Sequence, residues 1–289
     1  MTGFWYKLLV RVANLGGSWF FVLVSRIIAA GYFVFSKRVP ESRRFYAALY
    51  PERGRLYHLW CTFQQYQNFT TIHFDRFLMG QTKPVTFTSH GWENLDAVIS
   101  RQGGILLMSH LGNWEMAATV LKQRRDDLRL LLYMGVKEKE GVERMQKEDL
   151  RRSGVTIIAA DQEKSSPFSA VEGIRFLQSG GLVSMAGDIV WRSDQRKVPV
   201  TFLGHDAYLP EAPFVFALVS GAPLLVFFAF RTGKSSYHFT LSEPIAIQPA
   251  SRRARPQAIA RAAQQYADLL EQSLRQHPFE WYHFDRFIN

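Results

Sequence analysis

Two residues five positions apart, His110 and Glu115, are the residue types in this sequence best placed for acid–base chemistry. A carboxylate that binds one imidazole nitrogen fixes the tautomer of the ring and leaves the other nitrogen to act as a base. If the chain reverses between the two residues, this spacing brings the carboxylate back onto the imidazole. The pair therefore predicts a general base that removes a proton from a hydroxyl group or from water.

The residues around this pair predict how it is positioned. An apolar run over 105–108 follows two glycines and is typical of a short buried strand, and residues 114–123 have the composition of a helix. His110 then lies at the carboxyl end of a strand, the edge at which open α/β sheets bind ligands. Gly112 allows close approach to the backbone, and the helix start near Asn113 offers N–H groups to an anion.

The rest of the chain alternates between strands and helices, which predicts an α/β fold with a mostly parallel central sheet flanked by helices. We expect an α/β domain over 81–289 and a helical, membrane-associating region over 1–80, with 237–242 as an edge strand. The other strands are expected at 84–88, 128–134, 155–159, 181–186, 198–203 and 224–230. The other helices are expected at 92–101, 137–153, 168–178, 212–220 and 257–276.

Residues 4–36 are strongly apolar and aromatic, but their longest stretch without a charge, 12–25, has only 14 residues. A membrane-spanning helix needs about 20 apolar residues. We therefore expect a helix that lies in the membrane interface, with its basic residues at the lipid phosphates. The alternative is a helix that covers the core of the α/β domain.

The formal net charge of +10 favours a polyanionic partner, either an anionic membrane surface or an acidic acyl-carrier protein. We expect no nucleic acid partner, because no zinc-finger spacing or RNA-binding motif is present. The single cysteine, Cys61, excludes an internal disulfide and a cysteine-based zinc site. The motifs of serine hydrolases, zincins and nucleotide-binding proteins are also missing from the sequence.

Several segments resemble one protein family. The segment SHLGNWE (109–115) is similar to the H-x-x-x-x-D/E signature of the glycerolipid acyltransferases, in the form found in the lipid A biosynthesis (lauroyl/myristoyl) acyltransferases. The segments GGLVSMAGD (180–188), VPVTFLG (198–204) and HPFEW (277–281) resemble other blocks of that family. In the family the strand after the His motif ends in Tyr-Arg, whereas here it reads Leu132-Tyr133-Met134-Gly135. The family's Asp-Gln is Asp188-Ile189 here, and both changes lie near the expected acceptor site.

The resemblance implies an O-acyltransferase that moves a fatty acyl chain from acyl-carrier protein or acyl-coenzyme A to a hydroxyl of a lipid or glycolipid acceptor. His110 is then the general base and Glu115 orients it, with no metal and no bound cofactor. It also implies a place at the cytoplasmic face of the bacterial inner membrane, either peripheral or singly anchored. The expected substrate-binding residues are Gly112, Asn113, Arg151, Asp188 and Arg231.

Two other functions fit the same residues. A non-catalytic membrane-surface protein would use the fold to bind lipid or acyl carrier. A thioester hydrolase would use the same base on water. The product separates the three cases: acylated lipid, free fatty acid or neither.

Overall fold

The computed structural model describes residues 22–79, 86–114, 116, 121, 124–125, 127–136, 156–161, 167–190, 194–233 and 236–288. The predicted helix over 137–153 and most of the one over 114–123 lie outside these residues. Glu115 and Arg151 lie outside them too.

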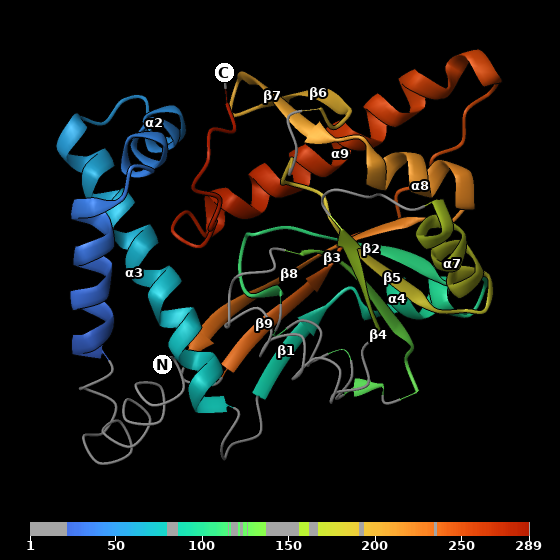
Figure 1. The fold of residues 1–289 in the computed structure, drawn as a ribbon, viewed down its shortest axis with the longest axis horizontal. Helices are drawn as coiled ribbons and strands as arrows, with labels where there is room; N and C mark the ends of the chain where they lie inside the picture. Colours follow the sequence, from blue (N-terminus) through green and yellow to red (C-terminus); the bar gives the residue numbers. More distant parts are fainter. Residues whose placement is uncertain are drawn as a thin grey trace.

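A seven-stranded sheet forms the centre of the molecule, in the order β1-β9-β8-β2-β5-β3-β4 (Figure 1). Its strands are β1 (Thr86–His90), β2 (Gly104–Met108), β3 (Leu130–Val136), β4 (Thr156–Asp161), β5 (Leu182–Ala186), β8 (Leu224–Gly233) and β9 (Ser236–Leu241). All neighbouring pairs are parallel except β8 and β9. The prediction of a mostly parallel sheet is therefore confirmed.

The expected position of the strand over 237–242 was wrong. This strand, β9, lies inside the sheet between β8 and β1, so β1 is the edge strand on this side of the sheet. The alternation that suggested an edge is real, because every second residue of β9 is buried. A strand with one solvated face shows this pattern whether or not a further strand pairs with it.

The described helices of the α/β part include α4 (Trp92–Ile99), α7 (Pro167–Gln178), α8 (Ala212–Ser220) and α9 (Arg255–Gln276), with a 3₁₀ turn, η1 (Arg252–Ala254). A separate antiparallel hairpin of β6 (Lys197–Phe202) and β7 (His205–Pro210) packs on α9 (Figure 1). Prolines stand in the first turn of α8 and α9, where a missing N–H costs no hydrogen bond. Gly221 ends α8 in the left-handed conformation that helix ends favour.

Apolar side chains fill both faces of the sheet. In β2, Ile105 and Leu107 join the core on the side of α9, whereas Leu106 and Met108 join the core on the side of α4. All five residues of β2 are buried, as expected for a central strand of a sheet covered on both faces. The predicted buried strand before His110 is thus confirmed.

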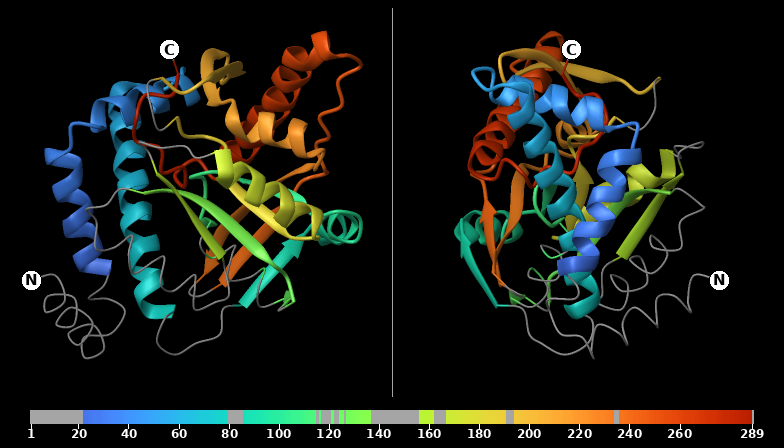
Figure 2. Two further views of the ribbon diagram at one scale, coloured as in Figure 1. Left: turned by 45° about the vertical axis from the view of Figure 1, so that its right-hand side comes forward. Right: turned by 90° about the vertical axis from the view of Figure 1, so that its left-hand side faces the viewer.

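The amino-terminal helices form a layer beside the sheet (Figure 2). They are a helix over residues 22–35, α2 (Val39–Leu49) and α3 (Arg55–Met79). Among the described residues, none of the helices has both the length and the apolarity needed to cross a membrane. Cys61 lies fully buried on α3, where burial raises the pKa of its thiol to about 11. The proposed division of the chain near residue 80 stays a prediction.

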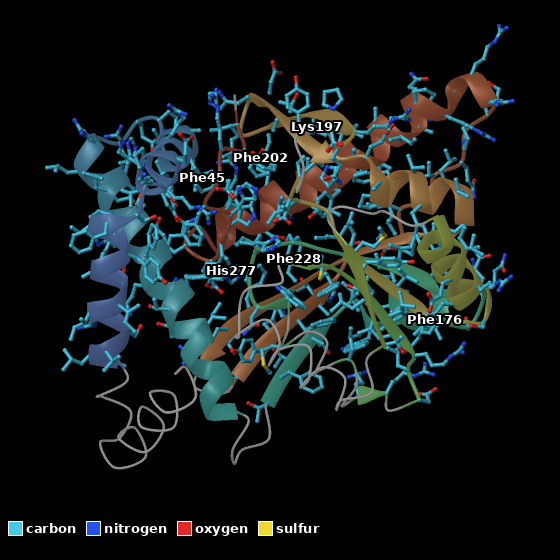
Figure 3. The ribbon with its side chains drawn as sticks, viewed as in Figure 1. Phe45, Phe176, Lys197, Phe202, Phe228 and His277 are labelled. Atoms are coloured by element: carbon cyan, nitrogen blue, oxygen red, sulfur yellow. The ribbon has the colours of Figure 1, made fainter. Side chains whose placement is uncertain are left out.

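The chain after α9 runs as an irregular segment, 277–288, which we call the closing tail. It lies between the amino-terminal layer and the β6–β7 hairpin (Figure 1). Trp281 of the tail packs against Phe45 of α2 and Phe202 of β6, with ring centroids 5.1 and 5.4 Å away. Figure 3 labels Phe45 on α2 and Phe202 on β6. The closing tail therefore joins the two parts of the molecule.

Candidate active site

Two polar residues meet at the carboxyl edge of the sheet because their strands are in register. β2 and β5 are parallel, and Met108 is paired with Ala186 at the end of the ladder. Each strand continues two residues further to a polar side chain, which is His110 on one and Asp188 on the other. Equal steps beyond paired residues bring these side chains next to each other.

The contact between His110 and Asp188 is made by two hydrogen bonds. The His110 ring nitrogen Nδ1 lies 2.9 Å from Asp188 Oδ1, and the His110 backbone N–H donates to Oδ2 at 2.7 Å. An ionised carboxylate can only accept, so the proton on this side of the ring belongs to Nδ1. The lone pair is then on Nε2, on a side chain that is one quarter exposed. This is the tautomer that a general base requires.

The Asp188 carboxylate is fully buried and ionised. Burial by itself would raise its pKa, but the charge of His110 and the His110 hydrogen bonds, with smaller effects of His283 and Trp281, lower the pKa to about 2. The Trp281 indole N–H donates to Oδ2 at 3.0 Å. Both carboxylate oxygens are thus held by donors, and such a buried charge has a fixed position.

The surroundings of this pair are apolar and closely packed. Tyr266 of α9 is fully buried and its hydroxyl donates to the Met108 carbonyl at 3.2 Å. Burial, followed by the charge of Asp188, raises the pKa of Tyr266 well above its ordinary value, so this phenol stays protonated. Gly187 precedes Asp188 where any Cβ would meet Leu107 and Tyr266 at 2.8 Å. The His110–Asp188 pair, which we call the relay, therefore packs against α9.

The backbone amides of the loop after β2 are already engaged. The Gly112 N–H donates to the Glu280 carbonyl at 2.9 Å, and the Asn113 N–H donates to the Ala229 carbonyl at 2.7 Å. The Leu111 N–H donates to Ser109 Oγ at 3.2 Å. In this structure the amides of residues 110–113 therefore hold the loop in place, and an oxyanion would need other donors.

Gly112 and Asn113 both have a clear role in the loop. Gly112 has φ of 76°, and a Cβ there would lie 2.5 Å from the Ala229 carbonyl oxygen, so only glycine fits. The buried Asn113 side chain accepts the Met116 N–H at 3.3 Å and donates to the Tyr237 hydroxyl at 3.4 Å. It thus caps the following helix, as asparagine commonly does. Their expected contact with substrate stays a prediction.

The other predicted site residues fall in different places. The sequence assigned the carboxylate partner of His110 to Glu115, whereas the structure gives the Nδ1 contact to Asp188. The contacts of Glu115 and Arg151 are outside the described residues. Arg231 lies near the end of β8, paired in register with Tyr237. Its charge acts on the buried Tyr282 hydroxyl, whose pKa is raised chiefly by burial.

Two small cavities lie near the relay. One has about 240 Å³ of empty space between β2, β3, β5, β8 and the helix that follows the loop. Its lining is almost entirely apolar: Leu106, Met108, Trp114, Leu121, Leu130, Leu132, Ser184 and Phe227. The other, of about 250 Å³, lies between α2 and the closing tail and includes Trp281 and His283 in a charged lining. Among the described residues, no group of histidine, cysteine and carboxylate side chains could hold a metal ion.

Sequence reasoning missed the partnership of Asp188 with His110 and the part played by Trp281. A signal for the first existed, because both strands end in the same way: His110 and Asp188 each stand two positions after the last paired apolar residue, Met108 and Ala186. The second had no local signal, since Trp281 lies 93 positions from Asp188. Only the tertiary fold brings the indole to the carboxylate.

Comparison with known proteins supplies a family. The model of the bacterial lipid A biosynthesis acyltransferases matches residues 74–287, a range that contains His110, Asp188 and Trp281. No curated protein matches the chain.

Proposed function

The chain belongs to the bacterial lipid A biosynthesis acyltransferase family, and from that premise we propose that it transfers a fatty acyl group from a thioester to a hydroxyl of a lipid acceptor. The observation that carries the proposal is the His110–Asp188 pair at the carboxyl edge of the sheet. A base held in one tautomer by a buried carboxylate is the group that this chemistry needs.

In the proposed reaction, Nε2 of His110 takes the proton of the acceptor hydroxyl while the oxygen attacks the thioester carbonyl carbon. The tetrahedral intermediate then expels sulfur, the carbon–sulfur bond breaks, and the imidazolium returns the proton to the departing thiolate. The products are an ester and a free thiol. Proton transfer of this kind contributes about 10²–10⁴-fold to the rate. Among the described amides, that of Trp114 comes next in the loop and is our candidate donor to the oxyanion.

The apolar cavity beside β2 is where we place the start of the acyl chain. Met108 and Trp114 line it and stand on either side of His110 in the sequence, so a chain lying there would bring its carbonyl to the base. Burial of methylene groups against such a lining stabilises the bound chain by about 0.8 kcal/mol each.

Exposed apolar residues on the helix over 22–35 support a membrane-associated acceptor. The side chains that face solvent are Val22, Leu23, Ile27, Ile28, Tyr32, Val34 and Phe35. Arg26 on this helix and Lys37 and Arg38 just after it are exposed, and Arg38 also pairs with Asp285 at 3.2 Å. A soluble surface seldom gathers so many apolar groups, and basic residues beside them suit anionic lipid phosphates. We propose that this segment lies in the interface at the cytoplasmic face of the inner membrane.

For the donor we propose acyl-carrier protein rather than acyl-coenzyme A. Arg252, Arg253 and Arg255 are exposed together at the start of α9, and the Arg196 side chain is 90% exposed, with Glu211 4.0 Å away. Arg125, by contrast, is bonded to Asp96 and Asp127 of its own chain. Two separated basic groups suit the broad acidic face of a carrier protein better than one nucleotide. Arg192 lies outside the described residues.

The test is product analysis with vesicles that contain bacterial lipids and either acyl donor. We expect mass spectrometry to show lipid heavier by one acyl chain, with the carrier-protein donor preferred and its advantage lost at high salt. His110→Ala should remove nearly all product. Free fatty acid alone would favour the hydrolase, and neither product would favour the binding protein. Equal use of both donors across a salt series would contradict the carrier-protein assignment only.

A further inference from the structure

A buried amide on α3 holds the backbone of Trp281. The side chain of Gln65 is fully buried, and its Nε2–H donates to the Trp281 carbonyl at 2.6 Å. The two residues are 216 positions apart, and Gln65 lies before the segment that the family model matches. A short, fully desolvated hydrogen bond between such distant segments fixes one against the other.

The same tryptophan continues the contact to the relay. Its indole N–H donates to Oδ2 of Asp188 at 3.0 Å, the oxygen that also accepts the His110 backbone N–H. Trp281 is itself buried to 99% and is enclosed by aromatic rings from α2, β6 and the tail. The ring thus has little freedom, and a shift of its backbone would move the indole N–H away from the carboxylate.

Further bonds hold the closing tail from both sides. On the helical side, the Tyr46 hydroxyl donates to the Pro278 carbonyl at 2.9 Å and the Asn68 amide donates to the Phe279 carbonyl at 3.3 Å. On the site side, the Tyr282 N–H donates to the His110 carbonyl at 2.8 Å. The tail therefore connects the amino-terminal layer directly to the residue that carries the base.

We propose that Gln65 and Trp281 are positioning residues of the His110–Asp188 relay, which rests on the function proposed above. The hydrogen bond from Gln65 fixes the position of the Trp281 backbone. The Trp281 indole then orients the Asp188 carboxylate, and the carboxylate orients the His110 imidazole. The amino-terminal layer then supports catalysis as well as the contact with lipid. Neither residue touches the reacting atoms.

Trp281→Phe tests the second step, because it keeps an aromatic ring and removes the N–H. We expect kcat to fall about tenfold, the effect of losing one hydrogen bond to a charged group, with KM within about twofold. Without the indole N–H, the negative charge of Asp188 is less stabilised and attracts the proton of the imidazole more strongly. The acidic limb of the plot of kcat against pH should therefore move to higher pH, by about one pH unit or less. A merely structural residue would lower the yield of folded enzyme without moving that limb.

Gln65→Leu tests the first step, and Gln67→Leu is its matched control. Gln67 stands on the same helix, but its amide donates to Ser25 of the helix over 22–35 at 3.0 Å, away from the tail. Each glutamine has one buried amide oxygen without a partner among the described residues. We expect Gln65→Leu to reproduce the change of Trp281→Phe in kcat and in the acidic limb, and Gln67→Leu to keep both.

A readout that does not need turnover separates this proposal from the function itself. The proton on His110 Nδ1 should give a low-field signal in NMR spectra of the full chain, and Trp281→Phe and Gln65→Leu should shift or broaden it. Unchanged spectra and pH profiles in both variants would overturn the proposal, as would equal effects of Gln67→Leu. Changed spectra in a chain that makes no acylated lipid would keep the positioning roles and reject the proposed reaction.

Discussion

Among the residues that the structure describes, two pairs of histidine and carboxylate differ in almost every physical respect. The first, His110–Asp188, joins two strand ends that lie 78 positions apart, at 2.9 Å. The second, His277–Glu280, is formed within one turn of the closing tail, at 3.3 Å. The imidazole of His277 lies flat on Phe230, with ring centroids 3.6 Å apart. Both stand close to the loop over 110–113, so position along the sheet does not distinguish them.

The two carboxylates show which pair is built for chemistry. Asp188 is completely buried and both of its oxygens accept hydrogen bonds. Glu280 is 16% exposed, and its Oε2 has no partner among the described residues. The backbone of Glu280, rather than its side chain, contacts the loop, because the Glu280 carbonyl accepts the Gly112 N–H. The comparison teaches that the His110–Asp188 pair fixes a buried charge, whereas the His277–Glu280 pair belongs to the turn that attaches the closing tail to the loop.

The largest effect that would sharpen this comparison is on catalysis. Asp188→Asn should lower kcat by about 10³–10⁴-fold, because an amide can donate to Nδ1 and so favours the wrong tautomer. Glu280→Gln should change kcat by less than about threefold, since the carbonyl that holds Gly112 is kept. Steady-state kinetics on both purified variants make the comparison. A loss in Glu280→Gln as large as that in Asp188→Asn would reverse the assignment of the two pairs.

A smaller effect concerns the loop that both pairs support. Gly112→Ala would place a Cβ against the Ala229 carbonyl and should displace the loop, at a cost of about 10²-fold in kcat. Gly180→Ala is the control: its φ of 81° is also positive, but a Cβ there meets nothing within 4 Å. The control should lose about 1 kcal/mol of unfolding free energy and keep its kcat. If both variants keep kcat, the loop geometry does not limit the reaction.

The smallest effect is on stability in acid. The folded pKa of Asp188, about 2, lies below its unfolded value of about 3.9, so ionised Asp188 stabilises the fold fully above pH 4 and loses this effect as the pH falls towards 2. The difference corresponds to about 2 kcal/mol. Denaturant unfolding between pH 5 and 2 should therefore show a steeper fall in the wild type than in Asp188→Asn. Parallel curves would mean that this carboxylate is not held as an ion.

The sequence was sufficient for a mostly parallel sheet and for the buried strand before His110, because apolar runs bounded by glycine are local features of the sequence. It did not predict the contact between His110 and Asp188. That contact depends on strand register, which pairs Met108 with Ala186 and is set by packing on both faces. The contacts of Gln65 and Trp281 depend on how an irregular tail packs against helices, and local propensity contains no information on that.

The burial of Cys61 has a consequence for how this protein can be assayed. Thiol reagents react with the thiolate, and with a pKa of about 11 the Cys61 side chain is ionised in only about one molecule in a thousand at pH 8. It is also the only cysteine in the chain. A chromogenic disulfide added to the native protein should therefore record any thiol set free from a donor against almost no background. Because Cys61 does not react, a cysteine introduced on the surface would be the one site that a thiol-specific spectroscopic label modifies.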